Sequence, residues 1–323
     1  MKMLSRLLAP LALALLAALP AAAQTVLNVN TALTTDDPMY AGLERMKANV
    51  EKRTAGKLTI RIYPGSQLGK DEDVLEQARA GANVAVLVDG GRLAPFVKEF
   101  GIMGAPYLVD NFDQVLRLTG SPLFKGWVDK LRNAANLQVL AFDWFQGHRH
   151  VLTNVAVKTP ADLKGIRMRT PGAPVWLETV RAMGATPTGM PWSEVYSALQ
   201  TKVIDGAEAQ HPAVYGARLY EVIKVITKTE HIYLITGIVT SRTWFDKLPA
   251  DQQKVLLEET EAAGKWASEK TIESLADYEK KLREKGVSVV EIDKTPFRNA
   301  TAGVYATLGY TDLRVEVNKA LGK

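Results

Sequence analysis

Short apolar segments alternate with longer segments of helical periodicity along most of the chain. A period of two or a continuous apolar run predicts a strand, and eight segments fit this description: residues 26–33, 58–63, 84–88, 137–142, 150–154, 166–169, 222–226 and 233–240. Helical periodicity predicts helices at residues 38–53, 71–80, 112–118, 123–134, 175–183 and 193–200. Such βαβ alternation predicts an α/β fold with mostly parallel strands and helices on the sheet faces.

The longest helical segment covers residues 251–285. It contains no proline and a single glycine, Gly264, and apolar residues such as Trp266 and Leu282 recur at helical intervals. An unbroken helix of this extent would be about 50 Å long, more than the width of one small domain. The chain of 323 residues can hold two domains, and its strand pattern restarts after Gly147. We therefore expect this helix to lie across both domains.

The N-terminal segment has the organisation of a secretory signal peptide. Lys2 and Arg6 form a basic start, residues 7–19 are almost entirely apolar, and three alanines ending at Ala23 supply the small residues of a cleavage site. The apolar run is shorter than the roughly 20 residues that a membrane-spanning helix needs. No cysteine follows it that could carry a lipid anchor. We expect export, cleavage near Ala23 and a mature chain that begins at Gln24 and is not inserted in the membrane.

Composition and the lack of known motifs argue against several classes of function. Without cysteine, the chain can form neither a disulfide nor a thiolate metal site. Its net charge of +5 is small, and no basic run with interleaved aromatic residues indicates nucleic-acid binding. The chain lacks G-x-S-x-G, H-E-x-x-H and phosphate-binding glycine motifs, and its four histidines lack metal spacing. We therefore predict that the protein is not an enzyme and binds no nucleic acid, cofactor or metal.

The segment 166–169 carries the most informative side chains. Alternation places Ile166 and Met168 on one face and Arg167 and Arg169 on the other. A guanidinium group is a planar, permanently charged fork that binds a carboxylate through two parallel hydrogen bonds. Taken alone, the pattern favours a solvated strand edge, since most arginines are exposed. A site for an acidic ligand is the alternative.

Three motifs resemble the solute-binding proteins of TRAP transporters, the DctP family. They are TPADLKGIRMRTPG at residues 159–172, PGSQLG at residues 64–69 and GHRHVLTN at residues 147–154. Further similarity at residues 185–200 and 203–208 extends the resemblance over essentially the whole mature chain. The family implies a two-lobe periplasmic-binding-protein fold, with a ligand cleft between the domains and a long helix that spans both.

This resemblance and the restart of the strand pattern together predict the domain limits. Domain I is expected to comprise residues 24–147 and about 231–265. Domain II is expected to comprise residues 148–230 and about 276–323, and the long helix of about 251–285 spans both.

The resemblance also implies two ligand-binding arginines. In the family, the last arginine of the strand after DLKG forms a salt bridge with the ligand carboxylate, and that position here is Arg169. The GHRH motif implies Arg149 as a second ligand-facing arginine, although the same residues also fit a polar loop that enters a strand. Alternation turns His148 and His150 away from Arg149.

Asp89 directly follows the apolar segment 84–88, at the carboxyl end of a strand, where open α/β sheets bind ligands. The comparable position in sialic-acid-binding members is acidic and faces the ligand, so Asp89 could accept hydrogen bonds from hydroxyl or amine groups. It could equally cap the next helix or pair with Arg92. An acid in the cleft would favour a hydroxylated or amino-bearing ligand over a plain dicarboxylate, because it repels a second carboxylate.

Trp192 and Tyr215 are predicted to form apolar walls of the cleft. The family often has an asparagine directly after the acid that aligns with Glu208, whereas this chain has an alanine there, followed by Gln210 and His211. Either of these two residues could replace the missing hydrogen-bond donor. Some relatives bind a metal through an acid at this turn, and Glu208 would permit one without requiring it.

The expected function is capture of a small organic acid in the periplasm by hinge closure, with Arg169 as the main carboxylate anchor. The expected partners are this acid and the membrane permease subunits of a TRAP transporter. A ligand-sensing module for a membrane receptor would use the same cleft, and an exported hydrolase is a further alternative. Sugar acids and short hydroxy acids are the leading ligand classes, with keto and aromatic acids still open.

Overall fold

The computed structural model describes residues 25–323 and places their strands in one mixed, nine-stranded sheet. The order is β2-β1-β3-β8-β4-β7-β5-β6, with β9 beside β8. The short strands are β1 (Thr25–Asn30), β2 (Leu58–Tyr63), β3 (Val84–Asp89), β5 (Arg167–Thr170), β6 (Thr186–Gly189), β7 (Gly206–Ala209) and β9 (Ser288–Val290). Pairing is parallel at both ends of the sheet and antiparallel at its centre, between β3 and β8, β8 and β4, and β4 and β7. The α/β fold is thus confirmed, but its centre is not parallel as expected.

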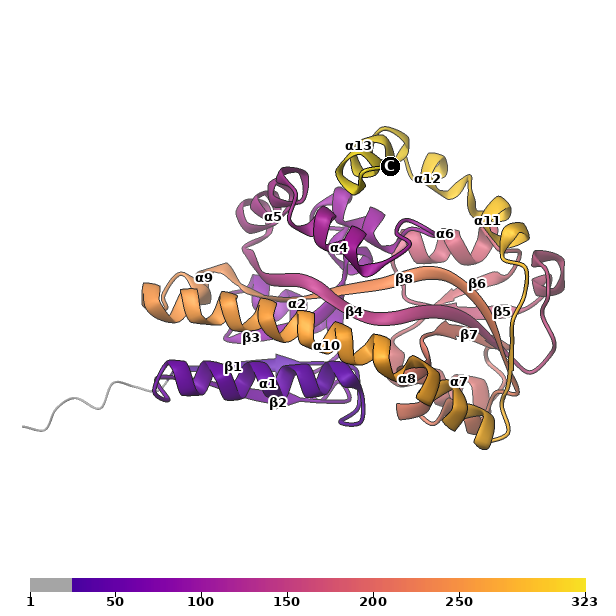
Figure 1. Cartoon of the computed structure of the whole chain (residues 1–323), viewed down its shortest axis with the longest axis horizontal. Helices are drawn as coiled ribbons and strands as arrows, with labels where there is room; N and C mark the ends of the chain where they lie inside the picture. Colours follow the sequence, from indigo (N-terminus) through magenta and orange to yellow (C-terminus); the bar gives the residue numbers. More distant parts are fainter. Residues whose placement is uncertain (1–24) are drawn as a thin grey trace, which may run out of the picture.

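Two long strands, β4 (Leu137–Thr153) and β8 (Val225–Ser241), run through both halves of the molecule (Figure 1). They pair antiparallel along almost their whole length, with several bulges. The sequence predicted each of them as separate shorter strands, because bulges interrupt the apolar alternation. One register shift lies between Phe145 and Gly147, where Gly147 has a φ of +114° that a side chain would strain.

The predicted long helix is confirmed as α10 (Ala250–Glu284), which packs on β4 and on α1 (Pro38–Arg53). Two glycines allow this close approach. A Cβ on Gly264 would lie 2.5 Å from Nε1 of Trp144, and one on Gly42 would lie 2.6 Å from Cβ of Ala267. Because no room exists for a larger side chain at either position, α10 rests directly on the strand that crosses the molecule.

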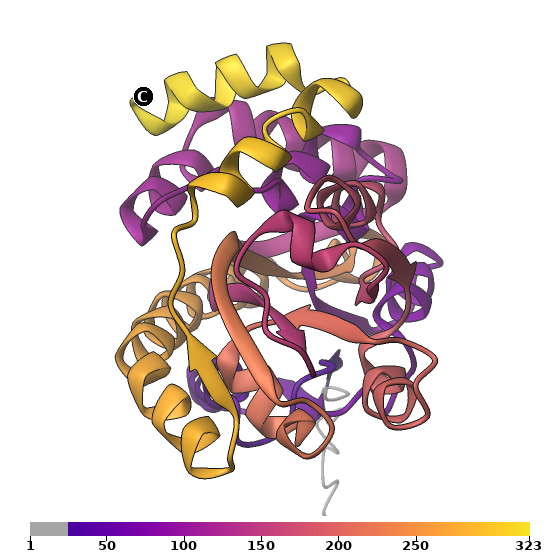
Figure 2. The ribbon, with the colours of Figure 1, turned by 90° about the vertical axis from the view of Figure 1, so that its right-hand side faces the viewer.

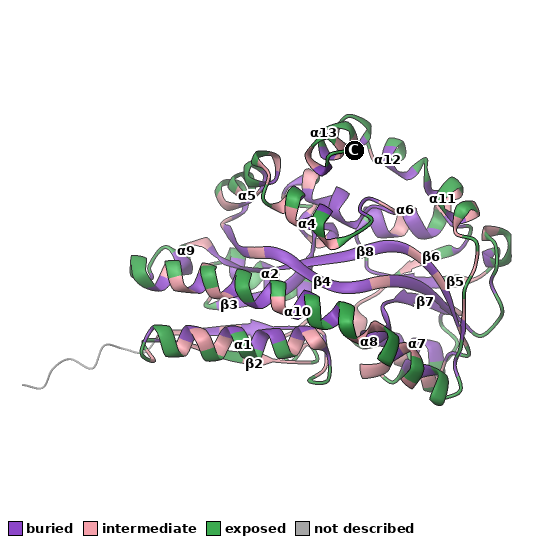
Figure 3. Cartoon of the chain, in the orientation of Figure 1, coloured by how far each residue is buried: buried purple, intermediate pink, exposed green. Residues whose placement is uncertain are grey.

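The other helices cover both faces of the sheet (Figure 2). They are α2 (Asp71–Arg79), α3 (Gly90–Leu93), α4 (Phe112–Thr119), α5 (Pro122–Ala135), α6 (Pro174–Ala182), α7 (Val195–Gln200), α8 (His211–Gly216), α9 (Arg242–Phe245), α11 (Thr295–Thr301), α12 (Val304–Thr307) and α13 (Thr311–Leu321). Buried residues follow β4 and β8 and the inner sides of the helices (Figure 3). This is the layered arrangement expected of an α/β core.

The C-terminal helices return across the molecule after β9. Helix α11 packs on α6 of the second half, whereas α13 packs on α4 and α5 of the first half. The hydroxyl groups of Tyr305 and Tyr310 donate hydrogen bonds to the carbonyl groups of Pro106 (2.7 Å) and Lys98 (3.2 Å). The packing of α13 therefore differs from the predicted limits, which placed residues up to 323 in domain II.

Within residues 25–323, no helix is both long enough and apolar enough to cross a membrane. The predicted signal peptide at residues 1–23 lies outside the described residues.

Candidate functional site

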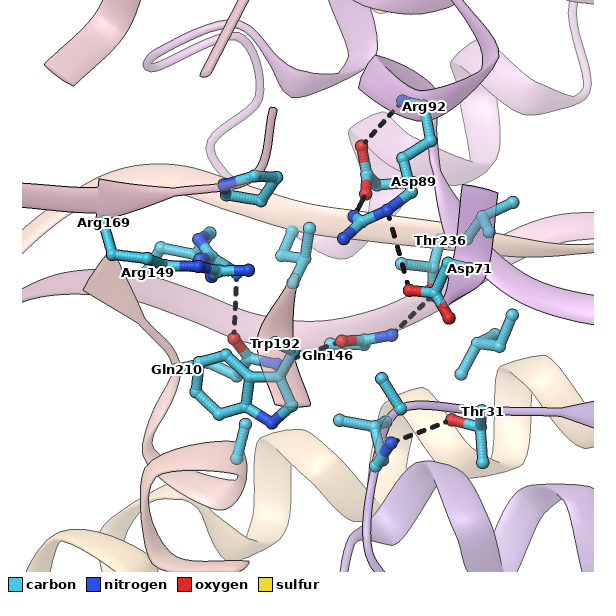
Figure 4. A pocket seen from close by; sticks show the side chains of 17 residues that line it. Thr31, Asp71, Asp89, Arg92, Gln146, Arg149, Arg169, Trp192, Gln210 and Thr236 are labelled. Atoms are coloured by element: carbon cyan, nitrogen blue, oxygen red, sulfur yellow. Dashed lines mark hydrogen bonds and ion pairs between the residues drawn. The ribbon is translucent and has the colours of Figure 1, made fainter. Parts of the chain in front are cut away.

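A cavity lies at the centre of the molecule, where elements of both halves meet over β4 and β8 (Figure 4). Most of the lining residues that are labelled in Figure 4 are polar or charged. The lining residues are Thr31, Ala32, Leu33, Asp71, Leu87, Val88, Asp89, Arg92, Gln146, Arg149, Arg169, Pro171, Trp192, Gln210, Ala213, Leu234 and Thr236. Of the residues predicted to bind a ligand, the structure brings together Arg169, Arg149, Asp89, Trp192 and Gln210 in this cavity.

Arg149 on β4 forms an ion pair with Glu208 on the neighbouring strand β7. Its guanidinium donates to both carboxylate oxygens, with a distance of 2.6 Å between Nη2 and Oε1. Glu208 has no exposed surface and also accepts a hydrogen bond of 2.8 Å from Thr170. Nε2 of His231 lies 3.4 Å from the same carboxylate. The charge of Arg149 is thus compensated inside the protein.

This environment sets the ionisation of Glu208. Burial alone would raise the pKa of Glu208, but the charge of Arg149 and the hydrogen bonds from His231 and Arg149 hold it at about 2. Glu208 is therefore a buried anion whose oxygens already have partners. This arrangement argues against the metal that the sequence permitted at Glu208, since a cation already occupies the position beside the carboxylate.

Arg169 on β5 has a different environment, although its side chain enters the same cavity. Its Nε and Nη2 atoms donate to the carbonyl oxygen of Met190 at 2.9 and 2.7 Å, and its Cζ lies 5.3 Å from the ring centre of Trp192. Arg169 is only 1% exposed, and it forms no ion pair with any residue in the described range 25–323. Burial and the nearby charge of Arg149 lower the pKa of Arg169 to about 9. Such a cation is stabilised when an anion enters the cavity.

The neighbouring arginine on the same strand shows the opposite situation. Arg167 is exposed and pairs with Asp205, with 2.8 Å between Nε and Oδ2. Only one of the two arginines of β5 therefore reaches the cavity.

Asp89 ends β3 and lines the cavity, yet both of its carboxylate oxygens have partners. Oδ1 accepts from the backbone N–H of Arg92 at 3.3 Å and from Nε1 of Trp176 at 3.0 Å, and Oδ2 pairs with the guanidinium of Arg92. Burial by itself would lower the pKa of Arg92, but the negative charges of Asp89, Asp71 and Glu72 outweigh this effect and raise the pKa above its ordinary value. The geometry thus corresponds to the helix cap and arginine partner that the sequence offered as the alternative for Asp89.

Amide and hydroxyl side chains line the part of the cavity between the charged groups of Arg149 and Asp89. Gln210 donates to Gln146 at 3.0 Å, and Gln146 donates to the hydroxyl of Thr236 at 3.2 Å. Oε1 of Gln210 also accepts from Nη1 of Arg149 at 3.3 Å. This row offers hydrogen-bonding groups to the hydroxyls of a ligand along the length of the cavity.

Two predicted ligand residues lie outside the cavity. His211 is buried against His150, with 4.5 Å between the ring centres, and burial lowers its pKa to about 4. Tyr215 contacts the rings of Tyr220 and Tyr278, at 5.6 and 5.8 Å between ring centres. These positions favour Gln210 over His211 as the replacement for the missing asparagine.

Sequence reasoning did not predict five polar residues of the lining as ligand residues: Thr31, Asp71, Arg92, Gln146 and Thr236. Asp71 opens α2 two residues after the end of the PGSQLG motif, so its position close to a motif of the family could have identified it. Gln146 and Thr236 lie inside long strands and carried no signal of their own.

Comparisons with known proteins identify the family to which the chain belongs. The family model described as "Bacterial extracellular solute-binding protein, family 7" (DctP) matches residues 29–312. The C4-dicarboxylate-binding periplasmic protein DctP of Rhodobacter capsulatus is 30% identical over 285 residues, covering 85% of each chain.

Two crystal structures of TRAP periplasmic solute-binding proteins are similar to this chain over almost its whole length. The apo open structure from Escherichia fergusonii is 43% identical, with a TM-score of 0.80 and coverage of 92% of this chain and 99% of that one. The structure from Ochrobacterium anthropi with bound L-fuconate is only 31% identical, but its TM-score is 0.90, with coverage of 93% and 100%. This chain is therefore more similar in overall structure to the relative with bound L-fuconate than to the apo open relative. The chain belongs to the DctP family of TRAP periplasmic solute-binding proteins, which are binding proteins and not enzymes.

Proposed function

We propose that this protein captures a small organic acid in the periplasm and delivers it to the membrane permease subunits of a TRAP transporter. The observation that carries the proposal is Arg169, a cation with 1% exposure and no anionic partner among the described residues, in a cavity between the two halves. A carboxylate is the group that matches its planar fork. Arg169 is therefore the proposed main anchor.

Capture would proceed by closure of two lobes. We propose lobes with the predicted limits, except that α13 belongs with the first half, on which it packs. An open cleft leaves Arg169 hydrated, and closure over an acid removes water and strengthens the charge-assisted hydrogen bonds. The higher TM-score to the L-fuconate-bound relative than to the open one supports such a closed arrangement here.

Arg149, Gln210 and Trp192 are proposed to complete the site. Because Glu208 already neutralises Arg149, this arginine acts as a hydrogen-bond donor to the ligand through Nη1 more than as a second free charge. Trp192 stacks beside Arg169 and forms the apolar wall of the carboxylate end. Hydroxylated monocarboxylates of the sugar-acid class, like the fuconate of the solved relative, fit this polar lining.

The test is calorimetric titration of the purified mature protein with a panel of sugar acids, hydroxy acids, keto acids and C4-dicarboxylates. Unfolding and refolding beforehand removes any acid carried over from the host. A ligand that binds only the native state stabilises it by about 2.7 kcal/mol when its concentration is a hundredfold above Kd. The melting temperature should therefore rise in the presence of such a ligand.

Arg169→Ala and Arg167→Ala form a matched pair for this test, because both arginines lie on β5 but only Arg169 lines the cavity. We expect acid binding to be lost in Arg169→Ala and kept in Arg167→Ala. Equal binding in both variants, or no binding of any acid by the refolded parent, would overturn the proposal.

Export and delivery are proposed from the N-terminal sequence and the family. Mass spectrometry of the protein from the periplasmic fraction is expected to show a chain that begins at Gln24. Uptake of the bound acid into vesicles with the permease subunits should require this protein and an ion gradient, but no ATP.

A further inference from the structure

The charged groups of the cavity are not all compensated to the same degree. Arg149 pairs with Glu208, and Arg92 pairs with Asp89. Two groups remain without a direct ionic hydrogen bond in the described part of the chain, Arg169 and Asp71. A ligand that fills the cavity therefore meets an unpaired cation and an incompletely bonded carboxylate.

Asp71 is the first residue of α2 and is 8% exposed. Its Oδ1 atom is buried and accepts no hydrogen bond from residues 25–323. Its Oδ2 atom forms an ion pair with Nε of Arg92 at 3.6 Å, a separation longer than a hydrogen bond. Glu72 and Asp73 occupy the same first turn but are exposed. An acid that served only the helix dipole would be equally effective at the surface, so the burial of Asp71 in the cavity has another explanation.

Asp71 and Arg169 lie on opposite sides of the cavity, with Gln146 between them in Figure 4. A ligand whose carboxylate contacts Arg169 therefore extends its other end toward Asp71. A hydroxyl at that end would donate to the free Oδ1 atom, whereas a second carboxylate there would meet a like charge.

We propose that Asp71 determines specificity at the end of the ligand opposite its carboxylate, accepting a hydrogen bond from a hydroxyl and excluding a second carboxylate. This inference deepens the proposed function and rests on it, because it requires the ligand carboxylate to lie at Arg169. The chemical class it selects is the polyhydroxy monocarboxylate, as opposed to the dicarboxylate of the same carbon skeleton.

The ionisation of Asp71 adds a dependence on pH. Burial raises the pKa of Asp71 to about 6, although the charges of Arg92 and Arg169 oppose this shift and those of Glu72 and Asp89 add to it. Protonation below this value converts Asp71 from an acceptor with negative charge into a neutral donor. The exclusion of dicarboxylates should therefore weaken as the pH falls through 6.

A matched pair of ligands tests the proposal: galactonate, which ends in a hydroxymethyl group, and galactarate, which carries a second carboxylate at that carbon. We expect the parent to bind galactonate at least about tenfold more tightly than galactarate at neutral pH. Asp71→Asn, which keeps the shape and removes the charge, should reduce this ratio by about tenfold, mainly through tighter binding of galactarate. Asp73→Asn is the matched control in the same helical turn and should leave the ratio unchanged.

A second measurement follows the galactarate affinity between about pH 7.5 and about pH 5. It should rise toward acid in the parent and stay flat in Asp71→Asn, a difference that a purely structural role would not produce.

The possible outcomes separate this inference from the proposed function. If acids bind through Arg169 but Asp71→Asn leaves the ratio within about twofold of the parent, the inference fails and the function stands. A parent that prefers galactarate, a C4-dicarboxylate or an acid without hydroxyl groups also overturns the inference. If no acid binds at all, both fail.

Discussion

Arg149 and Arg169 line one cavity, yet the protein treats their charges in opposite ways. Arg149 has a carboxylate partner with no exposed surface, whereas Arg169 has only a carbonyl oxygen and the face of an indole ring. Both guanidinium groups are nearly inaccessible, so exposure does not distinguish them. The two arginines thus differ in charge compensation and not in burial, and this difference is the basis on which we propose a structural role for Arg149 and a ligand-binding role for Arg169.

Arg149→Met should destabilise the fold more than any other single change proposed for the cavity. The substitution leaves Glu208 buried without its main cation, and removing one partner of a buried pair typically costs about 3–5 kcal/mol. Chemical denaturation should show this loss in the free energy of unfolding. The double variant Arg149→Met, Glu208→Gln removes both charges and should recover most of it; a double variant no more stable than the single one would show that the pair does not set the cost.

Arg169→Met should have the reverse profile. The free energy of unfolding of the ligand-free protein should not fall, because the substitution removes a buried cation that has no anionic partner. Ligand binding should weaken by about 2–5 kcal/mol, which is about 30-fold to several thousand-fold in Kd. Denaturation and calorimetric titration measure the two quantities. A variant that unfolds easily but still binds acid would reverse the assigned roles of the two arginines.

The stability of the protein at acid pH should show how much the ion pair of Arg149 and Glu208 contributes to the fold. The pKa of Glu208 is held at about 2, below its ordinary value of 4.5, so the pair stabilises the fold fully above pH 4.5. This contribution, about 3 kcal/mol, should be lost as the pH falls from 4.5 toward 2. The slope of unfolding free energy against pH in this window measures it. The Arg149→Met, Glu208→Gln variant should lose this part of the slope; an identical slope would assign the acid sensitivity to other groups.

The smallest expected effect concerns the aromatic wall beside Arg169. Trp192→Leu removes a ring at 5.3 Å from the guanidinium carbon and should weaken ligand binding by about 1 kcal/mol, or about fivefold. Tyr215→Leu is the control, since Tyr215 packs on other tyrosines away from the cavity. Titration with the best ligand should show a change only for Trp192, and a larger loss in Tyr215→Leu would contradict the placement of the site.

Periodicity and motifs predicted part of this molecule well. The long helix follows from a proline-free apolar repeat, and its extent as α10 agrees with the predicted range within a residue at each end. The motif around β5 pointed to Arg169, which lines the cavity, and its role in ligand binding stays a prediction. These features depend on local spacing, which a single sequence displays directly.

Other features depend on residues far apart in the chain. The ion pair of Arg149 and Glu208 joins positions 59 residues apart through the register of β4 and β7, and no local pattern encodes that register. The bulge at Gly147 likewise hid the continuity of β4. The sequence pointed to an acid in the cavity, but whether Asp89 or Asp71 keeps a free oxygen depends on the position of the Arg92 side chain.

The continuity of β4 and β8 through both halves has a mechanical consequence. Since β4 and β8 run through both halves, the proposed closure over a ligand would have to bend the sheet while the strands keep their pairing. We therefore expect opening and closure to change the curvature of these two strands and not their hydrogen-bond partners. Backbone amides in the crossing part of both strands should accordingly exchange slowly with solvent deuterium in the open and the closed protein alike.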